Sequence, residues 1–140
     1  MPELLSLLLN ALYALAKLKR PQALVKAVFE LRLACISGFL PDLRGCAVCG
    51  REDSDRFNIT QGVLQCATCQ SPELEGIRMP VSPGTLAAMR FIAAGDPKRL
   101  FSFQLSETSL RELNSITEGY LTMRLERGFY TLDSYKALFL

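Results

Sequence analysis

Four of the chain's five cysteines stand in two Cys-x-x-Cys pairs, and this arrangement constrains the fold more than any other feature. The stretch CAVCGREDSDRFNITQGVLQCATC, residues 46–69, has the spacing C-x2-C-x16-C-x2-C. This spacing is typical of a four-cysteine zinc site, in which each pair forms a tight turn that points both sulfurs at one ion. We therefore expect one structural Zn²⁺ to be bound by Cys46, Cys49, Cys66 and Cys69.

Other uses of the cysteines fit the pattern less well. A thioredoxin-like redox motif occurs as a single pair at the start of a helix, so a matched second pair argues against it. An iron–sulfur cluster and disulfides remain as alternatives to zinc. The fifth cysteine, Cys35, lies on the apolar stripe of a predicted helix, where a lone thiol is expected to be inert packing.

Composition predicts one folded domain without catalytic residues. The chain has 140 residues, of which 49% are hydrophobic and 21% charged, as in ordinary globular proteins. It contains no histidine, which excludes Ser-His-Asp and Cys-His catalysis, so we expect no enzyme activity. The net charge is only +2, so any DNA binding by this chain alone should be weak. Four thiolates around one Zn²⁺ would cancel even this small charge.

The apolar periodicity predicts a mainly helical fold with an inserted zinc module. Helices are expected at about 2–18 and 21–37, from a Ser82 cap to Gly95, and after Ser106 with a break or bend at Gly128. Between residues 41 and 80 the helical pattern disappears, and RFNIT and GVLQC read as a short β-hairpin turning at Gln61-Gly62. We therefore expect one discontinuous helical bundle, residues 1–43 and 73–140, interrupted by a zinc-ribbon or knuckle module at residues 44–72.

The opening segment MPELLSLLLNALYALAKLKR is apolar on nearly every helical face. A secretory signal would carry its positive charge first, whereas here Glu3 precedes the apolar run and the basic residues follow it. The run is also too short for a membrane span. We expect a helix covered on several sides in a cytoplasmic protein with no membrane contact, either at the centre of a bundle or in a chain cut out of a longer protein.

Several stretches together resemble the RecO family of bacterial DNA repair proteins, in its zinc-containing branch. They are FELRLACISGFLPDLRGCAVCG, GVLQCATC, VSPGTLAAMRFI, LRELNSITEGYL and LERGFYTL, in this order across nearly the whole chain. The resemblance is to the C-terminal part of the family. Its members begin with an OB-fold domain, and no strand-rich region precedes the first predicted helix here.

The resemblance implies an all-helical domain interrupted by a zinc module, and a role in recombinational repair through the RecF pathway. Proteins of this family bind and anneal DNA, associate with RecR, and help load RecA onto strands covered by single-stranded DNA-binding protein. They also recognise the acidic, hydrophobic tail of that protein. The same partners are therefore expected for this chain.

A binding surface for such a tail would combine an apolar helical groove with a basic rim. Our candidates for the rim are Arg32, Arg90, Lys98 and Arg99. The alternative is a generic zinc-ribbon scaffold or regulatory subunit that binds protein only. Salt dependence separates the two, because DNA affinity falls steeply as salt rises.

Overall fold

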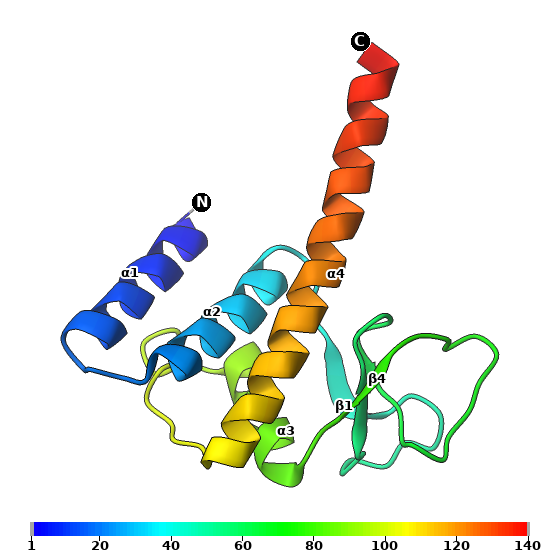
Figure 1. Cartoon of the computed structure of the whole chain (residues 1–140), viewed down its shortest axis with the longest axis horizontal. Coiled ribbons are helices and arrows are strands. Elements are labelled where there is room, and N and C mark those ends of the chain that lie inside the picture. The colour runs from blue at the N-terminus through cyan, green and yellow to red at the C-terminus, as the bar shows by residue number, and fades with distance from the viewer. Residues whose placement is uncertain (1, 140) are drawn as a thin grey trace.

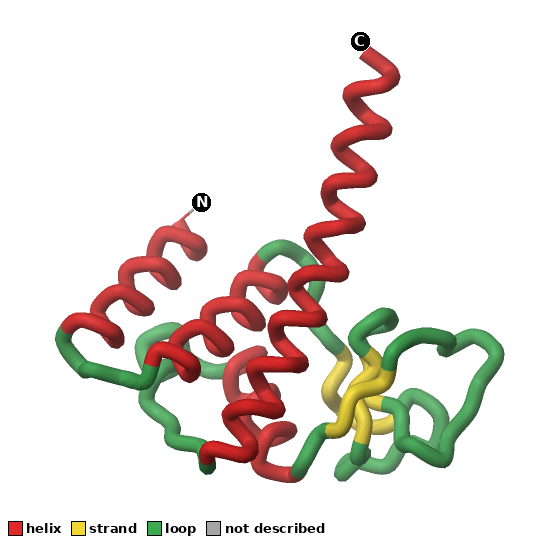
Figure 2. Tube along the Cα trace, viewed as in Figure 1, coloured by secondary structure: helices red, strands yellow, loops and turns green. Residues whose placement is uncertain are grey.

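The computed structural model describes the backbone of residues 2–139 and the side chains of residues 2–126. Long helices form most of the fold, and short strands gather beside them (Figures 1 and 2). In chain order the elements are α1 (Pro2–Ala16), α2 (Gln22–Ile36), β1 (Asp42–Cys46), β2 (Arg56–Asn58), β3 (Val63–Leu64), β4 (Arg78–Pro80), α3 (Pro83–Ala94) and α4 (Glu107–Phe139). The predicted mainly helical fold with an inserted β-containing segment is confirmed.

Two neighbouring residues, Ser82 and Pro83, determine where α3 begins. The Ser82 side chain accepts a hydrogen bond from the Thr85 N–H, which satisfies one of the free donors at the helix start. Pro83 occupies the first turn, where its missing N–H costs nothing. The helix ends before Gly95, as predicted.

One apolar core joins the helices to the sheet. Helix α4 packs mainly against α2, and α3 contacts both helices. The sheet contributes Phe57 and Leu64, both fully buried, to the same cluster as the helical residues. The β-containing segment is therefore packed onto the helices through its own apolar side chains.

The sheet is larger than the predicted hairpin. Strands β2 and β3 pair antiparallel, which confirms the hairpin, with Phe57 opposite Leu64. Strand β1 adds to β3 in parallel and β4 adds to β2 antiparallel, which gives the order β1-β3-β2-β4. The two additional strands were missed because each contains a residue unfavourable for strands, Gly45 in β1 and Pro80 in β4.

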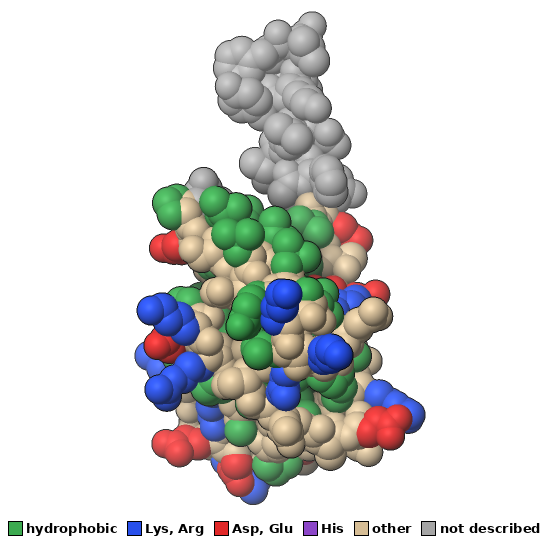
Figure 3. Space-filling model, turned by 90° about the vertical axis from the view of Figure 1, so that its left-hand side faces the viewer, with side chains coloured by type: hydrophobic (Ala, Val, Ile, Leu, Met, Phe, Trp, Pro, Cys, Tyr) green, Lys and Arg blue, Asp and Glu red, His purple; other side chains and the backbone are tan. Residues whose placement is uncertain are grey.

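Of the two explanations offered for the apolar α1, a position at the centre of a bundle is contradicted by this structure. Only one narrow stripe of α1, namely Leu7, Ala11 and Ala14, is buried. Seven large apolar residues of α1 and the turn after it are exposed: Leu5, Leu8, Leu9, Leu12, Tyr13, Leu15 and Leu18. In Figure 3, which views the molecule from the side of α1, apolar side chains gather on the upper part of the face above several Lys and Arg side chains.

Of the break or bend predicted at Gly128, the break does not occur. Helix α4 continues through this residue as one element of 33 residues. Glycine keeps both backbone hydrogen-bonding groups and costs only about 1 kcal/mol relative to alanine within a helix. One glycine is therefore not enough to end a long helix.

Among the described residues, no helix has the length and apolar character needed to cross a membrane.

Candidate metal centre

Two loops bring the four predicted cysteines together. Cys46 ends β1, and Cys49 lies in the turn after it. Cys66 and Cys69 lie in the turn that follows β3. Because β1 and β3 are neighbours, with Cys46 opposite Leu64, the two turns face each other. We call residues 46–49 the first knuckle and residues 66–69 the second knuckle.

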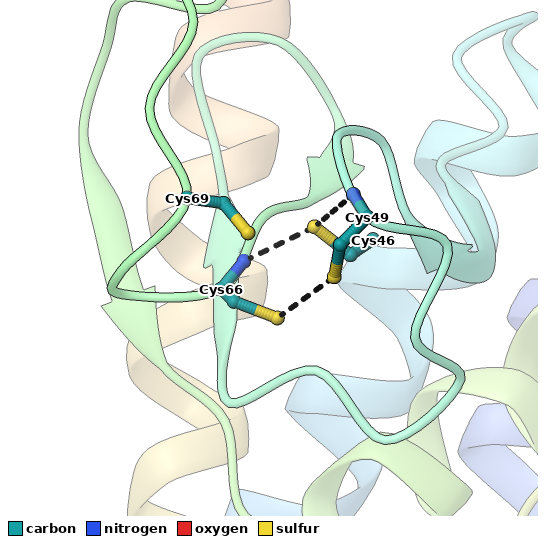
Figure 4. Close-up of side chains that lie close together, drawn as sticks. All are labelled: Cys46, Cys49, Cys66 and Cys69. Carbon is teal, nitrogen blue, oxygen red and sulfur yellow. Dashed lines mark hydrogen bonds between the residues drawn. The ribbon is translucent and has the colours of Figure 1, made fainter.

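The sulfur positions fit a tetrahedral metal site. The four Sγ atoms all lie within 4.8 Å of one another, and Figure 4 shows them converging from the two knuckles. The Cys49 and Cys66 Sγ atoms are 3.8 Å apart. A tetrahedral site with metal–sulfur bonds of about 2.3 Å has sulfur–sulfur edges of about 3.8 Å. A disulfide would need about 2.05 Å, and all four thiols are free.

Backbone N–H groups prepare Cys46 to act as a thiolate. Its Sγ accepts hydrogen bonds from Val48 N at 3.4 Å, Cys49 N at 3.5 Å and Cys66 N at 3.4 Å. Burial by itself would raise the pKa of Cys46, but the bonds from the backbone of Cys49, Cys66 and Val48 outweigh it and lower the pKa to about 6. Thiolate is the form that binds metal.

Burial and neighbouring thiols raise the pKa of both cysteines in the second knuckle. Burial, followed by contacts with the Cys49 and Cys46 thiols, raises the pKa of Cys69 to about 12. The pKa of Cys66 is also raised: a hydrogen bond with Ser54 lowers it, but burial and the neighbouring thiols prevail. A bound divalent cation would instead lower the pKa of these thiols, because it favours the deprotonated form of every ligand.

Two glycines allow the first knuckle to form. Gly50 has φ of +79°, a left-handed conformation that side chains disfavour. A Cβ at Gly45 would lie 2.8 Å from the Gly50 carbonyl oxygen, which is too close for any other residue. Gly45 could not be recognised from the sequence, because its role depends on a backbone contact that has no sequence signature.

Four protein sulfurs leave no coordination position for water or substrate, so the arrangement is suited to a structural ion. Cys46 and Cys66 are buried, Cys69 is half-buried and Cys49 is exposed. The donor set is all thiolate, which suits zinc or an iron–sulfur cluster and disfavours hard cations such as Mg²⁺.

One basic side chain beside the cysteine cluster was not identified from the sequence. Arg78 on β4 donates hydrogen bonds to the carbonyl oxygens of Cys66 and Cys69 in the second knuckle. The arginine stands outside both cysteine pairs, so the C-x2-C pattern gives no hint of it.

The structure separates the four basic residues that we predicted for a partner surface. Arg32 donates from Nη1 to the carbonyl oxygens of Ile92, Ala93 and Gly95, at the end of α3. It also lines a cavity of about 350 Å³ between α1, α2 and the loop after α3. Lys98 and Arg99 lie exposed on that loop.

Arg90 lies elsewhere, at the junction between α3 and the first knuckle. Its Nε donates to the Leu43 carbonyl oxygen at 2.9 Å and its Nη2 to that of Glu52 at 2.6 Å. These bonds fasten the chain on both sides of the first knuckle to α3.

Comparison with known proteins shows the family of the chain. Residues 1–133 match the family model described as Recombination protein O C terminal. The chain belongs to the RecO family. The predicted resemblance to the C-terminal part of RecO is confirmed.

Several curated relatives carry the name DNA repair protein RecO. The RecO of Acetivibrio thermocellus is 34% identical over 138 residues, which are 97% of this chain and 54% of the relative. That of Caldicellulosiruptor bescii is 30% identical over 136 residues, 96% of this chain and 54% of the relative. The RecO of Rubrobacter xylanophilus is 39% identical over 92 residues, 64% of this chain and 37% of the relative. The chain spans about half the length of the first two.

Proposed function

We propose that this chain is a helical, zinc-fastened binding domain of a recombination mediator that acts in cytoplasmic DNA repair. The observation that carries the proposal is the match of residues 1–133 to the C-terminal RecO model. The absence of histidine from the chain supports a binding role rather than catalysis. Its partners would be DNA, RecR and single-stranded DNA-binding protein, through which it would assist strand annealing and RecA loading.

The metal we propose is one structural Zn²⁺. Support comes from the all-thiolate donor set and from the 3.8 Å separation between the Cys49 and Cys66 sulfurs. Zinc would hold the two knuckles together and so fix the loops on either side of the β2–β3 hairpin.

For the acidic, apolar tail of single-stranded DNA-binding protein, we propose the cavity lined by Arg32. Its apolar lining includes Leu7, Ile36 and Leu100, and Pro97 borders it beside the exposed Lys98 and Arg99. Apolar side chains of the tail would enter the cavity while its carboxylates face the basic loop. We expect Arg90 to contribute little to tail binding, because both of its hydrogen bonds go to backbone carbonyls near the first knuckle.

DNA binding by this chain should be weak and salt-dependent. The net charge of +2 leaves few cations beyond those that balance acidic residues. The same small charge favours the second candidate, a zinc-ribbon scaffold that binds protein only.

Fluorescence anisotropy distinguishes the two candidates. The zinc-loaded chain is titrated against a labelled single-stranded oligonucleotide and against a peptide with the acidic, apolar tail sequence, each at two salt concentrations. The mediator proposal predicts tail binding together with weak oligonucleotide binding that salt abolishes. Tail binding without any DNA binding at low salt would favour the scaffold. Failure to bind either ligand would contradict both the cavity assignment and the mediator proposal for this domain.

Charge reversal tests the basic loop. The double variant Lys98→Glu and Arg99→Glu should weaken tail binding about tenfold or more. Each basic side chain would attract the acidic tail by up to about 1 kcal/mol, and each glutamate would repel it. The matched control is Arg44→Glu with Arg111→Glu, which changes the net charge equally at two exposed arginines outside the cavity lining. Equal affinity of the two double variants would remove Lys98 and Arg99 from the site.

A further inference from the structure

Arg78 makes an unusual set of contacts for a side chain outside the cysteine pairs. Its Nη1 donates to the carbonyl oxygens of Cys69 at 2.8 Å, Cys66 at 2.9 Å and Ala67 at 3.3 Å. One charged nitrogen therefore faces the backbone of both cysteines in the second knuckle. Hydrogen bonds from a charged donor are roughly twice as strong as neutral ones, which makes this contact a firm restraint on the loop.

A buried amide network also holds this loop. Gln65, which is 2% exposed, donates from Nε2 to the Cys69 carbonyl oxygen at 3.1 Å. Its Oε1 accepts from Asn58 Nδ2 at 3.1 Å, and Asn58 stands opposite Arg78 in the β2–β4 pairing. The Cys69 carbonyl thus receives donors from β4 and from the end of the β2–β3 hairpin.

The first knuckle is held differently. Backbone groups in it pair with other backbone groups: Gly50 N donates to the Cys46 carbonyl oxygen, and Ala47 N donates to that of Leu64. The Arg90 side chain binds carbonyls on either side of this knuckle rather than within it. The second knuckle has one such internal bond, from Cys69 N to the Cys66 carbonyl oxygen at 3.0 Å. Side chains supply further restraint: Asp55 Oδ1 accepts from the Ala67 N–H at 3.0 Å, and the neighbouring Gln65 and the more distant Arg78 donate to knuckle carbonyls.

We propose that Arg78 is a positioning residue for the metal centre, which holds the second knuckle in its ligand geometry through the Cys66 and Cys69 carbonyls. Cys69 and Cys66 then need little rearrangement when the ion arrives, and the loop resists opening when the ion is held. The Arg78 guanidinium also offsets part of the negative charge of four thiolates around a divalent cation. This inference rests on the proposed zinc site.

Metal affinity of the full chain tests the role of Arg78. Zinc dissociation constants are measured by competition with a chromophoric chelator for the native chain, Arg78→Gln, Arg78→Lys and Arg51→Gln. Loss of a residue that orients metal ligands typically weakens affinity 10- to 100-fold, and we expect Arg78→Gln to fall in this range. Arg78→Lys should recover part of the loss, since lysine keeps the charge but lacks the planar fork.

Arg51→Gln is the matched control for charge alone. Arg51 interacts electrostatically with Cys66 and Cys49, but its side-chain bonds go to Asp53 rather than to a knuckle carbonyl. It should change zinc affinity by no more than about threefold, as expected for an exposed charge pair. A loss equal to that of Arg78→Gln would overturn positioning in favour of a general charge effect.

A spectrum of the metal site and the Arg78→Lys variant separate a positioning role from a folding defect. The visible absorption of the Co²⁺-loaded chain should change in shape for Arg78→Gln and stay native for Arg51→Gln, because only the former alters ligand geometry. If Arg78→Gln does not fold, Arg78→Lys is the test of the positioning role. Native zinc affinity and a native Co²⁺ spectrum of Arg78→Lys would then overturn the inference. A native chain that binds no zinc would instead overturn the proposed metal site itself.

Discussion

Replacing Cys46 with serine is expected to abolish zinc binding and to open the segment from residue 44 to residue 72. Cys46 is 4% exposed and its sulfur accepts three backbone N–H groups, so it lies at the centre of the cluster. Structural zinc contributes about 10 to 16 kcal/mol of binding free energy in finger peptides. The net stability of a domain is only about 5 to 15 kcal/mol. Losing the ion should therefore unfold the segment around it.

Metal analysis and limited proteolysis measure this effect. Cys46→Ser and Cys66→Ser should both lack zinc and be cut within residues 44–72. The control is Cys35→Ser, since Cys35 is a half-buried free thiol on α2, outside the cluster. A metal-free Cys46→Ser chain that resists the protease as well as the native chain would show that zinc does not fasten this segment.

Tyr120→Ala is expected to lower the free energy of unfolding by about 3 to 5 kcal/mol, as for other large aromatic truncations in a core. Tyr120 lies on α4 and is 2% exposed. Its ring meets that of Phe57 on β2 edge to face, with centroids 5.6 Å apart, and Gly62 lies against it. The change would therefore leave a cavity where the sheet rests on the helices.

The hydroxyl of Tyr120 can be tested separately. It donates to the Phe39 carbonyl oxygen at 2.6 Å, in the segment between α2 and β1. Tyr120→Phe keeps the ring and should cost about 1 kcal/mol, the usual net worth of one hydrogen bond. Chemical denaturation of zinc-loaded protein measures both variants. Similar losses for Phe and Ala would show that the hydroxyl, rather than the ring, anchors the sheet.

Local chemistry made part of this fold and site predictable from sequence. The C-x2-C pairs identified all four clustered sulfurs, because the spacing itself encodes two tight turns and a returning hairpin. Ser82 and Pro83 marked the start of α3 correctly, since capping depends on neighbouring residues alone.

Features that depend on distant contacts were not predictable. Strand β4 consists of three residues and gains its partner only when the chain returns to β2. Arg78 binds backbone carbonyls, which every residue carries, so no sequence pattern identifies its targets. In the same way, the leucines of α1 look alike in sequence, and only the fold decides that Leu7 is buried while Leu8 is exposed.

Hydrogen exchange of the full chain before and after removal of metal by a chelator tests the central claim most directly. If zinc fastens the inserted segment to a helical RecO domain, exchange should become fast across residues 44–72 when the metal leaves, while the buried faces of α2 and α3 stay protected. Unchanged protection across residues 44–72 after complete metal removal would contradict the account.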